Sequence, residues 1–158
     1  NDRYYRSLME EKELTGVLIT EFRYVLLMRA DSPLAALETI TYDDLRRYME
    51  IAHADPSVPS LPLEDGKKED ACETLGRRIY VFERASQFSL LSENPDTFMW
   101  VSPVPKSMLD RYGLVERECA SDRGVYKDVF IHRKDYSLTP LDNAFIEHLI
   151  RVKRETIH

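Results

Sequence analysis

The sequence has few cysteines, no long apolar run and no excess of positive charge. Its two cysteines, Cys72 and Cys119, lie far apart and form neither a CxxC pair nor a zinc-like cluster with the histidines, so we expect reduced structural thiols, no metal and no cofactor. The longest apolar runs, such as residues 24–28, are too short to cross a bilayer, and the first residues lack the apolar core of a signal peptide. We therefore expect a cytoplasmic location and no membrane partner.

The chain also lacks the charge pattern of a nucleic-acid-binding surface and the short motifs of common enzymes. Charged residues form 32% of the sequence, but the formal net charge is -6 and both signs are mixed along the chain, so no basic stripe faces phosphates. No GxSxG, HExxH, P-loop or GxGxxG motif occurs, so we expect no enzymatic activity. What remains is a chain of 158 residues with 43% hydrophobic residues, which suits one compact domain or two small lobes.

Short strand patterns alternate with helix patterns along the sequence. Hydrophobic periodicity and capping residues predict helices over 4–12, 41–48, 85–91 and 106–112 and from 140 onward. Runs of β-branched and aromatic residues predict strands over 17–19, 22–28, 49–54, 79–82, 98–101, 114–117 and 125–132. Thr41 and Thr139 are predicted N-caps, and Gly113 is predicted to end a helix. This alternation predicts an α/β architecture with largely parallel sheets.

Four segments carry motifs of one protein family, in that family's order. Residues 24–35, YVLLMRADSPLA, resemble a strand and "HPLA" turn, with Ser32 where His is commonest, and residues 41–45 are similar to a short helix "(S/T)xxDL". Residues 126–135 are similar to a late strand ending in "yRkd", and residues 138–149 to a closing helix "lsPaarxFixxl". Together these segments resemble the effector-binding domain of LysR-type transcriptional regulators.

The resemblance implies a periplasmic-binding-protein-like (type 2) fold with two lobes. Residues 1–31 would be part of the first lobe, residues 32–124 a complete second lobe, and residues 125–158 a return to the first lobe through the final strand and helix. The implied function is to bind a small-molecule effector between the lobes and so modulate DNA binding. A winged helix-turn-helix outside this chain would contact promoter DNA, in a homodimer or homotetramer. The alternative is an extracytoplasmic solute-binding protein, because such proteins share the two-lobe architecture.

Polar and aromatic side chains follow three of the predicted strands at their carboxyl ends, where ligands of open parallel sheets bind. The candidate ligand-binding residues are His53, Asp55, Ser57, Ser86, Gln87, Trp100 and Ser102. Hydroxyl, amide and aromatic groups suit recognition of a small organic molecule. A structural interpretation stands beside this one, in which the serines cap helices or turns, Asp55 belongs to a proline turn and Trp100 lies in the core.

Overall fold

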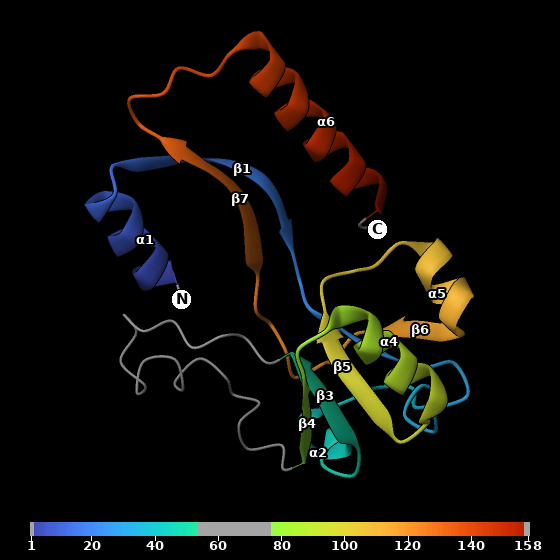
Figure 1. Ribbon diagram of the computed structural model, residues 1–158. Coiled ribbons are helices and arrows are strands. Elements are labelled where there is room, and N and C mark those ends of the chain that lie inside the picture. The colour runs from blue at the N-terminus through green and yellow to red at the C-terminus, as the bar shows by residue number, and fades with distance from the viewer. Residues whose placement is uncertain (1, 54–76, 157–158) are drawn as a thin grey trace.

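A two-stranded ribbon and a five-stranded sheet form the framework of the molecule (Figure 1). The computed structural model describes residues 2–53 and 77–156. Strand β1 (Leu14–Phe22) pairs antiparallel with β7 (Tyr126–Arg133) to form the ribbon. The sheet has the order β4-β3-β5-β2-β6, made of β2 (Val25–Arg29), β3 (Met49–His53), β4 (Arg78–Val81), β5 (Thr97–Val101) and β6 (Leu114–Arg117).

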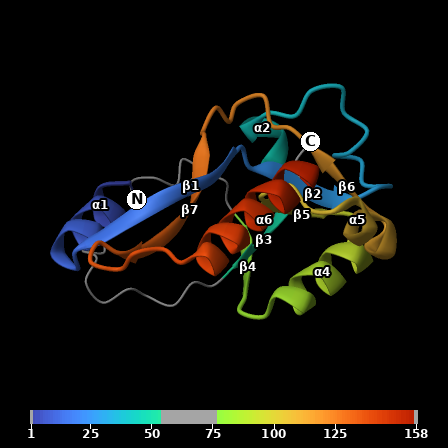
Figure 2. The ribbon, with the colours of Figure 1, turned by 90° about the horizontal axis from the view of Figure 1, so that it is seen from above.

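Helices cover both faces of the sheet and both faces of the ribbon. Helices α4 (Arg84–Glu93) and α5 (Lys106–Tyr112) pack on one face of the sheet, and the short α2 (Tyr42–Leu45) lies on the other (Figure 2). Helix α1 (Asp2–Glu11) and helix α6 (Pro140–Thr156) both contact β1. On β7, Phe130 packs toward Phe145 of α6, whereas the adjacent Val129 lies near Met9 of α1, so the two helices cover opposite faces of the ribbon.

The central strand β2 supplies core residues to both faces of the sheet. Leu26 and Met28 are fully buried under α2, and the intervening Leu27 is fully buried under α4 and α5. An unbroken apolar strand is what a sheet covered on both sides requires. Each such side chain contributes about 1.5–3 kcal/mol when it leaves water.

The sequence predicts largely parallel sheets, and this prediction is wrong. Strand β2 runs antiparallel to both of its neighbours, and the ribbon is antiparallel; only β3 runs parallel to β4 and β5. The reason is the path of the chain. Strand β2 leaves the ribbon after residues 23–24 and runs away from it, whereas β3 and β5 return toward the ribbon.

Local sequence signals at helix ends are confirmed. Helix α5 has the predicted bounds and ends at Gly113, whose φ of 63° lies in the left-handed region that favours glycine. At the start of α6, the Thr139 backbone N–H donates to the Asp142 carboxylate at 2.8 Å, and the Asp142 N–H donates to the Thr139 hydroxyl at 3.2 Å. The Thr41 N–H donates to the Asp44 carboxylate at 2.9 Å in the same way, although α2 ends at Leu45 rather than near residue 48.

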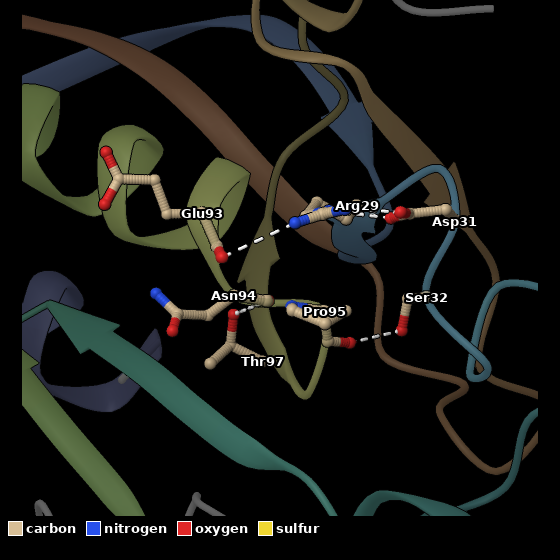
Figure 3. Close-up of polar contacts among 7 residues, drawn as sticks. All are labelled: Arg29, Asp31, Ser32, Glu93, Asn94, Pro95 and Thr97. Carbon is tan, nitrogen blue, oxygen red and sulfur yellow. Dashed lines mark hydrogen bonds and ion pairs between the residues drawn. The ribbon is translucent and has the colours of Figure 1, made fainter.

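A polar cluster closes the end of the sheet that lies away from the ribbon (Figure 3). The Arg29 guanidinium pairs with Asp31, with one contact of 2.7 Å, and also donates to the Glu93 carbonyl at the end of α4, at 3.4 Å. Ser32 is buried, and its hydroxyl donates to the Pro95 carbonyl at 2.7 Å. The hydroxyl of Ser32, which stands at the usual histidine position of the "HPLA" motif, thus has its hydrogen-bond acceptor in the neighbouring turn. The cluster joins two loops and does not form an open site.

The division of the chain into residues 1–31, 32–124 and 125–158 stays a prediction, and one element argues for a different first boundary. Strand β2 was placed with residues 1–31, but it is hydrogen-bonded between β5 and β6 in the five-stranded sheet. A boundary at residues 23–24, where the chain leaves the ribbon, agrees better with this pairing than a boundary after Asp31.

Candidate functional site

Several strands meet at the edge of the sheet nearest the ribbon. Parallel strands β3 and β4 end side by side, with His53 opposite Val81. Strand β5 ends at Val101, which pairs with Val25, the first residue of β2 after the ribbon (Figure 1). We name this the strand-end edge. Ligands of α/β sheets bind beyond the carboxyl ends of strands, so this edge is the candidate site.

A carboxylate caps helix α4 where the helix begins at the strand-end edge. Glu83 precedes the helix in an extended conformation, and its carboxylate accepts the backbone N–H of Ala85 at 2.9 Å and of Ser86 at 2.6 Å. The Ser86 hydroxyl also donates to it, at 2.7 Å. The Ser86 hydroxyl and these two N–H groups hold the pKa of the Glu83 carboxyl below its usual value.

Glu83 was missed as a site residue in the sequence. The preferred N-cap residues are Asn, Asp, Ser and Thr, so a glutamate between a strand and a helix is not predicted to be an N-cap. The signal that could have found it is its position directly before the helix pattern, because negative charge is stabilised at a helix N-terminus.

Gln87 joins α4 to the ends of β3 and β4. Its side chain is fully buried, and its amide nitrogen donates to the Val81 carbonyl at 2.9 Å and lies 3.2 Å from Nδ1 of His53. Its amide oxygen accepts from the Arg84 guanidinium at 3.0 Å, which fixes the orientation of the amide. Each polar atom of the Gln87 side chain therefore has an intramolecular partner. These contacts fix the start of α4 against the ends of β3 and β4.

Strand β5 places its two candidates differently from each other. Ser102 follows the strand and is half-buried at the strand-end edge. Trp100 packs against the core under α2, and its ring centroid lies 6.3 Å from that of Tyr42. The indole N–H of Trp100 is buried and has no hydrogen-bond acceptor among the described residues.

The structure thus brings some of the predicted site residues together and leaves others apart. His53, Ser86 and Gln87 lie at the strand-end edge, within one hydrogen-bonded group, and Trp100 is half-buried against the core under α2. Asp55 and Ser57 lie outside the described residues. Contact of any of these residues with a ligand stays a prediction.

Aromatic rings gather where the ribbon joins the sheet. The ring of Tyr24, in the connection between β1 and β2, lies 5.4 Å from that of Phe22 and 4.3 Å from that of Tyr126, centroid to centroid. Phe22 and Tyr126 also stack, at 5.9 Å. These contacts hold the end of β1 against the start of β7, beside the strand-end edge.

The described part of the chain offers no alternative site of metal or thiol chemistry. No group of three or more His, Cys, Asp and Glu side chains within residues 2–53 and 77–156 is arranged to hold a metal ion. Cys119 is buried, and this burial raises the pKa of its thiol, which disfavours the nucleophilic thiolate. In the same part of the chain, no helix is both long enough and apolar enough to span a membrane.

No protein-family model and no curated protein matches this sequence. Solved structures do match. The effector-binding domain of QuiR in complex with shikimate aligns over 94% of this chain with a TM-score of 0.64 and 19% identity. The regulatory domain of MetR, a LysR-family regulator from N. meningitidis, aligns over 92% with a TM-score of 0.64 and 15% identity. The chain has the fold of a LysR-family regulatory domain.

The Synechocystis PCC6803 CcmR regulatory domain, in complex with 2-PG, shares this LysR-type fold, with a TM-score of 0.62, 15% identity and 94% of this chain aligned. The two-lobe, periplasmic-binding-protein-like architecture expected from the sequence is therefore confirmed at the level of the fold. The chain spans about two thirds of the length of these structures, namely 69% of the QuiR effector-binding domain, 66% of the MetR regulatory domain and 71% of the CcmR regulatory domain.

Proposed function

We propose that this chain is the effector-sensing part of a LysR-type transcriptional regulator. The observation that carries the proposal is the alignment of nearly the whole chain, in order, with regulatory domains of that type. The arrangement of the strand-end edge supports it, because strand ends, the start of α4 and the ribbon junction lie together there. Two of the aligned structures hold small organic molecules, shikimate and 2-PG.

In this proposal the effector binds between two units, one that contains the five-stranded sheet and one that contains the ribbon of β1 and β7. The chain connects the two units at residues 23–24 and again between β6 and β7. A ligand that contacts both units stabilises one relative angle over others, and so shifts an existing equilibrium. The rings of Phe22, Tyr24 and Tyr126 lie at this connection and would repack as the angle changes.

The remaining parts of the proposal concern the full-length regulator. Promoter DNA would be contacted by a separate winged helix-turn-helix and not by this chain, whose net charge of -6 does not favour phosphates. The regulator would act in the cytoplasm as a homodimer or homotetramer and would catalyse no reaction.

Ligand-induced stabilisation tests the proposal. The full chain is mixed with a panel of small metabolites that includes shikimate, 2-PG and neutral and cationic compounds, and thermal unfolding is followed. A true effector at about 100 times its dissociation constant stabilises the folded state by about 2.7 kcal/mol. Amide chemical shifts then locate the compound, and we expect the changes at residues 53, 81–87 and 101–102.

A pair of serine variants sharpens this test. Ser102→Ala removes a half-buried hydroxyl at the strand-end edge, whereas Ser89→Ala removes an exposed hydroxyl in the middle of α4. We expect Ser102→Ala to weaken binding and Ser89→Ala to leave it unchanged. Chemical-shift changes confined to the far end of the sheet, around Arg29 and Pro95, would contradict the proposed site.

A further inference from the structure

The Glu83 carboxylate occupies two backbone N–H donors and one hydroxyl donor at the start of helix α4. It accepts two backbone N–H groups, from Ala85 and Ser86, and the Ser86 hydroxyl. A carboxylate has about four acceptor positions, so three of them are used within the protein. The Gln87 backbone N–H donates to the Glu83 carbonyl at 3.3 Å. In the first turn of the helix, Glu83 therefore accepts the N–H groups of Ala85, Ser86 and Gln87.

Other donors near the start of α4 are also engaged within the protein. The Arg84 guanidinium donates to the Gln87 amide oxygen, and the Gln87 amide nitrogen donates to the Val81 carbonyl. A bare helix N-terminus is a ready site for a carboxylate or phosphate group. Here an incoming anion would have to displace Glu83 from both N–H groups, and would then meet the displaced negative charge a few ångströms away.

We propose that Glu83 is a specificity-determining residue, which closes the N-terminus of α4 to anionic effector groups. The effector-sensing role rests on the function proposed above. In that role, the effector presents a neutral or cationic group to this side of the site, and any anionic group that it carries is bound elsewhere. The Glu83 carboxylate is tethered beside these N–H groups, so it competes with a dissolved anion at an effective concentration of about millimolar.

Titration of sulfate into the isotope-labelled full chain tests this inference directly. Ionic strength is held constant with chloride, and the backbone amides of Ala85 and Ser86 are followed by NMR. In the wild type we expect no saturable shift of these two amides. In Glu83→Ala we expect saturable shifts at both, with an affinity for sulfate at least about tenfold above that of the wild type.

Glu93→Ala is the matched control. It removes an exposed glutamate from the other end of α4, so it changes the net charge of the protein by the same amount. We expect no saturable shift at Ala85 and Ser86 in this variant. If Glu83→Ala frays the helix, as loss of the Leu90 and Leu91 amide signals would reveal, Glu83→Ser retains a capping hydroxyl and removes the carboxylate. Glu83→Ser should then show the gain in sulfate affinity.

Two results would overturn the inference. One is saturable sulfate binding at Ala85 and Ser86 in the wild type with the same midpoint as in Glu83→Ala. The other is a gain in Glu83→Ala, or in the Glu83→Ser replacement, no larger than that in Glu93→Ala. The failure of every metabolite to bind would instead count against the effector-sensing function, because the sulfate experiment requires no effector.

Discussion

Replacement of Gln87 by Met asks whether the buried amide holds the strand-end edge together. Methionine has a similar length and no amide, so Gln87→Met retains the volume and removes the contacts with Val81, His53 and Arg84. The side chains of His53 and Arg84 are exposed and regain water, whereas the Val81 carbonyl loses its partner in a half-buried position. An acceptor left unsatisfied costs about 1–3 kcal/mol, so we expect the free energy of unfolding to fall by about that amount.

Urea denaturation measures this change. We expect the midpoint of Gln87→Met to fall while the slope of the transition stays the same, because the surface exposed on unfolding does not change. Ser89→Ala, at an exposed position of the same helix, serves as the control and should lie within about 0.5 kcal/mol of the wild type. A Gln87→Met variant as stable as the wild type would refute the reasoning, since the amide would then contribute nothing beyond its volume.

Three further predictions concern other parts of the fold. Arg117→Met removes the guanidinium that donates to the carbonyls of residues 35, 37 and 38. We expect faster hydrogen exchange in residues 35–38 and a free energy of unfolding lower by about 1–3 kcal/mol. Arg117→Lys should recover only part of this stability, because an ammonium group lacks the planar set of donors of a guanidinium. Gly113→Ala should cost about 1–2 kcal/mol in calorimetry from its left-handed backbone alone, because an added Cβ has no neighbour within 4 Å; equal stability would contradict this. Hydrogen bonds lower the pKa of three helix-capping carboxyls, those of Asp44, Glu83 and Asp142. Their contribution to stability is therefore present at neutral pH and is lost as the pH falls through the lowered pKa values. We expect the unfolding temperature to fall below about pH 4, and we expect a smaller fall when these carboxyls are replaced by amides.

The sequence by itself determined most helices and the start and end of several of them. Thr139 and Asp142 cap α6, and Gly113 ends α5, because capping depends on residues three or four positions apart and needs no distant partner. The same locality explains why motif order along the chain led to the correct fold, confirmed by the aligned regulatory domains.

Only the tertiary structure decided how the strands are directed and which polar groups remain available at the site. The sequence of β2 predicts a buried strand but not its direction. Its antiparallel pairing depends on where the chain leaves the ribbon and enters the sheet. The same holds for the strand-end edge. Ser86 and Gln87 follow a strand end as the sequence predicts, but the partners of Gln87, His53 and Val81, are set by the packing of α4 against β3 and β4. A hydrogen bond between residues distant in sequence leaves no periodic trace, so its donor and acceptor emerge only once the chain is folded.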